Sequence, residues 1–223
     1  MRPVKPAQQK IRDDLARIVE TQQNSRWQRP IAEHSDAAFT QVRDWVAASS
    51  KPLILDSCCG TGDSTRHLAR TFPHAQVLGI DKSAHRLARH QRDATASYVI
   101  LRADVNDFWR LALRAGWRPV RHYLFYPNPY PKASQVRKRW YASPALPVLL
   151  SLGGLLTVRS NWALYAEEFA YALDSVGVAA TWRQIRVATP VSAFEAKYQA
   201  RGHALYEVVS DLRSYAGPPH SST

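Results

Sequence analysis

Residues 53–69 read LILDSCCGTGDSTRHLA, and this segment gives the clearest indication of the fold. A short apolar run ends in Asp56, a turn with Gly60 and Gly62 follows, and apolar residues then recur at helical spacing. A glycine-containing turn between a strand and a helix lets a ligand approach the backbone at the helix N-terminus. The segment therefore predicts a strand, a ligand-binding turn and a helix.

The alternation of strands and helices continues toward the C-terminus. Further strands are expected near residues 77–80, 98–101, 122–126, 155–158, 181–187 and 204–209. Helices are expected near residues 134–150 and 162–173, with none of convincing strength between the last two strands. This order predicts an α/β, Rossmann-like fold with a mostly parallel seven-stranded sheet and an antiparallel edge.

The 223 residues suit one domain, which we expect at residues 51–212. Residues 1–50 carry a helical stripe and are expected to form an N-terminal helical extension, and residues 213–223 a disordered tail. No apolar run is long enough to span a membrane, and the first residues lack the apolar core of a signal peptide. We therefore expect a cytoplasmic protein that does not enter membranes.

The net charge of +12 is concentrated in one part of the chain. Residues 111–160 carry eight basic side chains and no acidic one. Such clustering favours a polyanionic partner, either nucleic acid or an acidic membrane surface, over a basic surface that only aids solubility. The adjacent Cys58 and Cys59 have neither disulfide nor zinc-pair spacing, so we interpret them as small packing residues.

Three acids follow three successive strands, and they indicate the kind of ligand. Thr65 stands where a dinucleotide-binding GxGxxG pattern has its third glycine, and no GK[ST] follows the turn. Asp56 would repel a phosphate but attract a cationic amino group. Asp81 is placed to accept hydrogen bonds from ribose hydroxyls, and Asp104 from an adenine amino group. Together with the glycine-containing turn, they predict a nucleoside-type ligand, with S-adenosylmethionine favoured over NAD.

The segment from Asp56 to Gly62 has the form D-x-[small]-x-G-x-G. It resembles motif I of the class I S-adenosylmethionine-dependent methyltransferases, except that Cys58 replaces the first glycine. The resemblance implies that S-adenosyl-L-methionine is the cofactor. The residues it implies for cofactor binding are Asp56, Ser57, Cys58, Gly60, Gly62, Asp81, Lys82, Asp104 and Val105.

A narrower resemblance begins at residues 126–132, which read YPNPYPK and are followed by RKR at 137–139. The segment resembles the F-P-D-P-W-P-K signature and basic cluster of the tRNA (guanine-N(7)-)-methyltransferases. RSN at 159–161 and SAFEAKY at 192–198 are similar to two further segments of that family, so the resemblance runs from about residue 52 to 210. It implies a methyltransferase that acts on tRNA or another structured RNA, most readily at guanine N7.

The same resemblance assigns residues to the substrate. Asn128, at the catalytic position, would line the base pocket with Ser160, Asn161, Ser192 and Glu195. Tyr130 would be available to stack on a base. Phosphate contacts are expected from Lys132, Arg137, Lys138, Arg139 and Arg159, although a charge run can also be a solvated helix face. No metal is expected, and a monomer is favoured.

The base pocket departs from the family pattern at Asn128 and Asn161, where the family has carboxylates. A carboxylate accepts two hydrogen bonds from guanine, and its replacement by an amide changes discrimination by roughly 1–3 kcal/mol. Methylation at N7 needs no general base, because N7 carries no proton. Three functions remain open: guanine N7 methylation, methylation of another base position or a small molecule, and RNA binding with a vestigial donor site.

Overall fold

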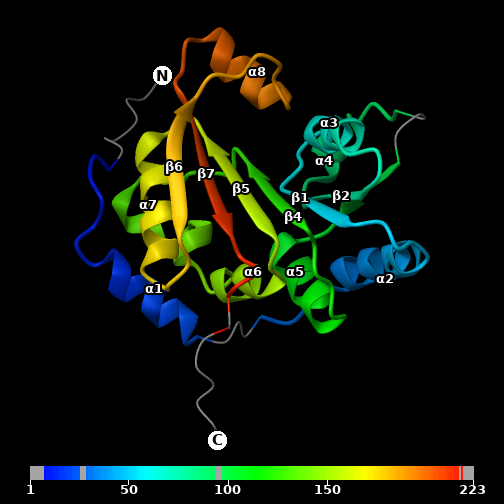
Figure 1. Ribbon diagram of the computed structural model, residues 1–223, viewed down its shortest axis with the longest axis horizontal. Helices are drawn as coiled ribbons and strands as arrows, with labels where there is room; N and C mark the ends of the chain where they lie inside the picture. The colour runs from blue at the N-terminus through cyan, green and yellow to red at the C-terminus, as the bar shows by residue number, and fades with distance from the viewer. Residues whose placement is uncertain (1–7, 26–28, 94–96, 216, 218–223) are drawn as a thin grey trace, which may run out of the picture.

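Within the residues that the structure describes (8–25, 29–93, 97–215 and 217), seven strands form one sheet in the order β3-β2-β1-β4-β5-β7-β6 (Figure 1). The structure is a computed structural model. The strands are β1 (Leu53–Ser57), β2 (Gln76–Asp81), β3 (Tyr98–Arg102), β4 (Arg121–Phe125), β5 (Leu155–Ser160), β6 (Ala180–Ile185) and β7 (Leu205–Asp211).

The sheet is parallel except around β7, which pairs antiparallel with both β5 and β6. This confirms the predicted mostly parallel sheet with its antiparallel edge. Because β1 to β5 run parallel, their carboxyl ends meet along one edge of the sheet, where ligands of open α/β sheets bind. Asp56, Asp81 and Asp104 therefore come from the same side of the molecule.

Helices cover both faces of the sheet. They are α1 (Leu15–Gln23), α2 (Glu33–Ala47), α3 (Asp63–Thr71), α4 (Ala84–Leu87), α5 (Val105–Arg114), α6 (Leu146–Leu152), α7 (Ala163–Asp174) and α8 (Ala193–Ala200). Successive strand residues point to opposite faces, so Leu55 joins the large core under α5 and α7, while Ile54 packs with Leu68 of α3 on the other face. No helix in the described part of the chain is long and apolar enough to cross a membrane.

The region after β4 differs from the prediction. In place of one helix over residues 134–150 there are two 3₁₀ helices, η1 (Ala133–Lys138) and η2 (Trp140–Ala142), before α6. Pro144 forces an extended conformation on Ser143 (ψ 161°), which interrupts the helical pattern. The chain therefore changes direction at Ser143, between η2 and α6, and does not continue as one helix.

The connection between β6 and β7 also differs, because it contains the helix α8 where none was expected. Ser192 caps this helix, and its hydroxyl accepts a hydrogen bond from the Glu195 backbone N–H. The expectation of a disordered tail concerns residues 213–223, of which 216 and 218–223 lie outside the described residues.

Candidate active site

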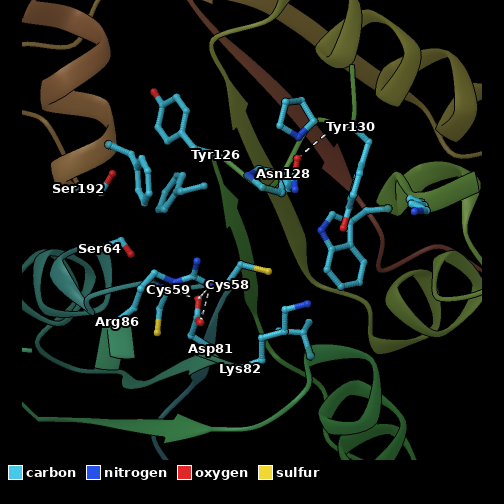
Figure 2. Close-up of a pocket in the computed structure, with 18 of the residues that line it drawn as sticks. Cys58, Cys59, Ser64, Asp81, Lys82, Arg86, Tyr126, Asn128, Tyr130 and Ser192 are labelled. Atoms are coloured by element: carbon cyan, nitrogen blue, oxygen red, sulfur yellow. Dashed lines mark hydrogen bonds and ion pairs between the residues drawn. The ribbon is translucent and has the colours of Figure 1, made fainter. Parts of the chain in front are cut away.

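A cavity of about 790 Å³ opens at the carboxyl ends of the parallel strands. Figure 2 shows Asp81, Lys82 and Arg86 on one wall, and Asn128 and Tyr130 on another. The side chains that line it come from the loops after β1, β2, β3, β4 and β5, and from η1, η2 and α8. They include Cys58, Cys59, Gly60, Thr61, Ser64, Asp81, Lys82, Arg86, Asp104, Val105, Tyr126, Asn128, Tyr130, Arg137, Lys138, Trp140, Asn161, Ser192, Phe194 and Tyr198.

The loop after β1 folds tightly under this cavity. Gly60 and Gly62 have positive φ angles of 63° and 78°, which glycine adopts without steric cost. Cys58 has a φ of 65° although it carries a Cβ, and this conformation costs roughly 1–2 kcal/mol. Burial raises the pKa of the Cys58 thiol to about 12 and that of Cys59 well above its ordinary value. Both thiols stay protonated at neutral pH, which agrees with a packing role.

Asp56 lies behind this loop and does not line the cavity. Its Oδ2 accepts hydrogen bonds from Ser64 Oγ (2.6 Å) and Thr65 Oγ1 (2.7 Å), which fix the start of α3. Its Oδ1 is buried and has no partner among the described residues. Burial raises the pKa of Asp56 to about 6. The carboxylate thus keeps an unused acceptor inside the protein, at the position expected to attract the ligand's amino group.

Two other predicted residues beside Asp56 also lie off the cavity. Ser57 is fully buried, is hydrogen-bonded to His122 Nε2 (2.8 Å) and accepts from Trp109 Nε1 (2.9 Å). Burial lowers the pKa of His122 to about 3, so this histidine is neutral. Gly62 is the N-cap residue of α3, and a Cβ there would lie 2.3 Å from the side chain of Ile100. Both residues shape the loop from behind.

Asp81 lies on the cavity wall at the end of β2. Its carboxylate accepts hydrogen bonds from the backbone N–H groups of Gly60 (3.0 Å) and Ser83 (2.8 Å), and it pairs with Arg86 (2.7 Å; Figure 2). Lys82 lines the same wall. The sequence did not point to Arg86, because an arginine two residues into a four-residue helix carries no motif.

Asp104 and Val105 complete this side of the cavity. Asp104 caps α5, and its Oδ1 accepts hydrogen bonds from the backbone N–H and the side-chain amide of Asn106 (2.9 and 2.8 Å). Its role as a helix cap therefore coexists with a position on the cavity wall. Six of the nine residues expected to bind the cofactor line the cavity, and Asp56, Ser57 and Gly62 support it from behind.

The Pro-rich segment after β4 forms the opposite wall. Asn128 Oδ1 accepts a hydrogen bond from the Tyr130 backbone N–H (3.2 Å), which closes a tight turn. Tyr126 and Tyr130 have positive φ angles of 52° and 46°. Non-glycine residues in this conformation are strained, and such strain is concentrated at functional sites.

The basic cluster 137–139 divides between the surface and the core. Arg137 and Lys138 are exposed and line the cavity, and Lys138 Nζ lies 6.0 Å from the Tyr130 ring centre. Arg139 is fully buried, so the expected phosphate contact of Arg139 is contradicted by its position. Its guanidinium pairs with Glu168 and donates a hydrogen bond to the carbonyl of Tyr130 (3.0 Å), so Arg139 fixes the turn.

Glu168, on α7, joins three parts of the chain. It is fully buried and accepts hydrogen bonds from Arg139 and Tyr141 at Oε2. Its Oε1 accepts from Gln8 Nε2 (2.7 Å), and the Gln8 backbone N–H donates to the carbonyl of Pro131 (3.0 Å). The N-terminal segment, α7 and the Pro-rich wall are therefore held together at one carboxylate.

Two residues expected in the base pocket, Ser160 and Glu195, and one expected at a phosphate, Arg159, are turned away from the cavity. Glu195 is buried and bonded to Tyr126 Oη (2.6 Å) and Arg159 Nη1 (3.0 Å), and Ser160 is buried as well. Arg159 is also paired with Glu207 (3.0 Å), so its guanidinium is already occupied. These side chains turn inward and brace the wall. Of the base-pocket residues, Asn128, Asn161 and Ser192 line the cavity; Lys132 is exposed but outside it.

An aromatic face on α8 was missed in the sequence. Phe194 is 46% exposed and stacks with Tyr198, with ring centres 6.4 Å apart, and Tyr198 lies 5.5 Å from Tyr126. The available signal was the i, i+4 spacing of Phe194 and Tyr198, which places them on one helix face. Exposed aromatic rings beside a cavity are suited to stacking on a nucleobase.

The described residues fit a cationic nucleoside such as S-adenosylmethionine. The carboxylates of Asp81 and Asp104 lie on the cavity wall, and Asp56 offers an unused buried acceptor behind the loop. These groups suit ribose hydroxyls, an amino group and a positive sulfonium, while a phosphate would be repelled. Within the described chain, no group of three or more His, Cys, Asp or Glu side chains is arranged to hold a metal ion.

Comparisons with known proteins agree with this geometry. A family model described as a putative methyltransferase matches residues 50–208. The tRNA (guanine-N(7)-)-methyltransferase of Treponema pallidum (strain Nichols) is 28% identical over 171 residues, covering 73% of this chain and 68% of that protein. The protein of the same name from Nocardia farcinica is 32% identical over 181 residues, covering 71% and 66%.

Solved structures share the fold. The 16S rRNA methyltransferase KamB superposes with a TM-score of 0.58 at 18% identity, covering 85% of this chain and 97% of that one. A 16S rRNA (adenine(1408)-N(1))-methyltransferase from Catenulisporales acidiphilia gives a TM-score of 0.55 at 13% identity, covering 79% and 93%. These likenesses confirm the predicted Rossmann-like architecture.

Proposed function

The chain belongs to the family of putative methyltransferases whose model matches residues 50–208, and from this premise we propose that it methylates tRNA at N7 of a guanine, with S-adenosyl-L-methionine as the donor. One observation carries the proposal. A single cavity joins the acids Asp81 and Asp104 to a wall of Asn128, Tyr130 and exposed basic side chains. The relatives named tRNA (guanine-N(7)-)-methyltransferase support guanine N7 as the methylated atom.

The chemistry demands positioning more than proton transfer. S-adenosylmethionine supplies a methyl group bonded to a positive sulfur. The N7 lone pair forms the new N–C bond while the S–C bond breaks and its electron pair returns to sulfur, so the positive charge passes to the base. No proton moves, and a wall without a strong base is sufficient if it holds the base in line.

Each wall has a proposed task. Asp81 binds the donor's ribose hydroxyls, Asp104 its adenine, and Asp56 attracts its amino end through the loop. Tyr130 and Phe194 flank the base, because both rings border the cavity and every base has a face to stack on. Arg137 and Lys138 meet RNA phosphates at the cavity wall, and the exposed Lys132 meets them outside it.

The oligomeric state and the cellular location of the protein are also proposed from the cavity and its substrate. One chain contributes both the donor wall and the Pro-rich wall of the cavity, so the site needs no second copy, and we propose a monomer. Because its proposed substrate is tRNA, we expect the protein in the cytoplasm.

The function is tested by incubating the protein with bulk tRNA and donor labelled in its methyl group, and then digesting the RNA to nucleosides. We expect labelled 7-methylguanosine. Label in a different nucleoside would show that the protein methylates another base position and not guanine N7. RNA binding with no labelled nucleoside would reject an enzyme and leave an RNA-binding protein.

Replacing Asp81 tests the donor site. We expect Asp81→Ala to weaken donor binding at least tenfold, about 1.4 kcal/mol or more, because hydrogen bonds to a carboxylate contribute about 1.5–3 kcal/mol each. Calorimetric titration with S-adenosylhomocysteine measures the loss. Asp44→Ala, an exposed acid on α2, is the matched control and should bind like the unmodified protein. Equal affinity of the two variants would remove Asp81 from the donor site.

A further inference from the structure

A second hollow, with a volume of about 300 Å³, lies beside the cavity described above. It opens around the loop that leaves β6, the outer strand of the sheet (Figure 1). Because β5 and β6 both pair antiparallel with β7, they run in the same direction and end at the same edge. Val191 lines this hollow and the next residue, Ser192, lines the cavity, so one loop borders both. We call the second hollow the arginine groove, after Arg159, Arg183 and Arg186, which line it.

Glu207 of β7 holds two of these arginines side by side. In the sheet it lies opposite both Arg159 and Arg183, so the three residues occupy one level of neighbouring strands. Its Oε2 accepts a hydrogen bond from Arg159 (3.0 Å), and its Oε1 accepts one from Arg183 (3.1 Å). The carboxylate is buried and each of its oxygens faces a guanidinium. Glu207 therefore braces the two arginines within the wall of the groove.

Positive charge remains in excess in the arginine groove. Arg159 is also paired with the buried Glu195 (3.0 Å), so two carboxylates face three arginines. Arg183 uses one nitrogen to bind Glu207, and its side chain is 74% exposed. Arg186 is exposed, and among the residues that the structure describes no acid lies within ion-pair distance of it. Two guanidinium groups thus keep N–H donors that solvent can reach.

The loop that carries Arg186 is fixed at both ends. The side chain of Gln199 on α8 donates a hydrogen bond to the carbonyl of Val187 (2.6 Å), and Val191 is buried in the core under α3. His67 of α3 also lines the groove. Burial and the charge of Arg159 lower the pKa of His67, so its ring is neutral at pH 7 and offers one N–H donor. Arginines held on fixed backbone are suited to binding the oxygens of a phosphate.

We propose that the arginine groove binds a backbone phosphate of the substrate RNA, beside the nucleotide whose base enters the cavity. The inference rests on the function proposed above and adds a second place at which the RNA is held. Arg183 and Arg186 contact the phosphate oxygens, while Glu207 keeps Arg183 in position. Such a contact carries no base information, but it fixes the direction in which the strand crosses the mouth of the cavity. The site lies largely outside residues 111–160, where the positive charge of the sequence is concentrated.

The test removes both available guanidinium groups by combining Arg183→Gln with Arg186→Gln. Binding of bulk tRNA is measured by filter binding over a range of salt concentrations. We expect the affinity to fall about 5- to 20-fold at about 0.15 M salt, because charge-assisted hydrogen bonds to phosphate are lost. The dependence of log K on log salt should become less steep by about 0.7–0.9, the change for one phosphate contact. Affinity for S-adenosylhomocysteine should stay the same, which shows that the variant is folded.

Two further double variants serve as controls. Arg43→Gln with Arg213→Gln removes the same charge from two exposed arginines. They lie at the opposite edge of the sheet, because Arg43 is near the end of α2, which leads into β1, and Arg213 follows β7, whose last residue pairs with the first residue of β5. This control should bind tRNA like the unmodified protein. Arg183→Lys with Arg186→Lys keeps both charges in the groove and should restore the salt dependence.

Each result bears on the proposal. A loss confined to the glutamine variant of the groove, with recovery in the lysine variant, supports it. Unchanged affinity and salt dependence in the glutamine variant overturn it, and so does an equal loss in the Arg43 and Arg213 control or a lysine variant without recovery. The labelled-tRNA assay is independent of these measurements. Its failure would reject the proposed methylation, whereas unchanged RNA binding in the groove variant would reject only the phosphate site.

Discussion

Replacing Glu168 by alanine is expected to lower the free energy of unfolding by about 3–5 kcal/mol. Glu168 and Arg139 are both fully buried and paired with each other. Removing the carboxylate leaves the guanidinium in the core without its counter-charge, and also strips the hydroxyl of Tyr141 and the amide of Gln8 of an acceptor. An unpaired buried charge is among the most damaging single changes in a folded protein.

Urea denaturation followed by circular dichroism measures this loss. The matched control is Glu167→Ala, one residue earlier on α7, where a partly exposed carboxylate is removed from the same helix. It should change the free energy of unfolding by no more than about 0.5 kcal/mol. If both variants were equally stable, the Arg139–Glu168 pair would not be the anchor of the Pro-rich wall.

Replacing Asp56 by asparagine is expected to remove a pH dependence from the stability of the protein. Burial raises the pKa of Asp56 from 3.8 to about 6. The folded state therefore binds this proton more tightly than the unfolded state, and ionisation destabilises the fold. The protonated Asp56 carboxyl contributes stability to the fold. This contribution is complete below pH 3.8 and is lost as the pH rises through about 6. The full cost at neutral pH is about 3 kcal/mol, and about 2 kcal/mol of it accrues between about pH 4.5 and 7.5.

The measurement is the difference in unfolding free energy between Asp56→Asn and the unmodified protein at about pH 4.5 and 7.5. That difference should move in favour of the variant by about 2 kcal/mol, whatever constant cost the amide brings. Asp44→Asn, an exposed acid, should show no such change. A constant difference for Asp56→Asn would mean that this carboxyl is not destabilised by burial. A protein that keeps a costly buried acid gives up stability for function.

The donor half of the cavity could be predicted because its signals are local. Apolar runs, the Gly60–Gly62 turn and the acids at the strand ends lie close together in sequence, and the parallel sheet brings them to one edge. The exception is Asp56, whose side chain points behind the loop, where Ser64 and Thr65 bind it. Strand assignment alone does not settle which way a terminal side chain turns.

The substrate half was predicted less well, because its arrangement depends on distant partners. Arg137, Lys138 and Arg139 are chemically alike, and the third of them is a core residue because distant groups bind its guanidinium, chief among them Glu168, 29 residues away. Likewise Arg159 draws Glu195 inward and so turns Phe194 and Tyr198 of α8 toward the cavity. A resemblance identifies such segments but not which of their side chains face the ligand.

The contacts of Glu168 also determine the order in which the two walls of the cavity can form during translation. The polypeptide is synthesised from its N-terminus, so Gln8 and Arg139 leave the ribosome before the carboxylate that joins them. The strands β1 to β3, at whose ends the donor acids lie, emerge after Gln8 but before Arg139. A nascent chain can thus assemble the donor wall while the Pro-rich turn still lacks its anchor, and the RNA-facing mouth is completed only in the last third of translation.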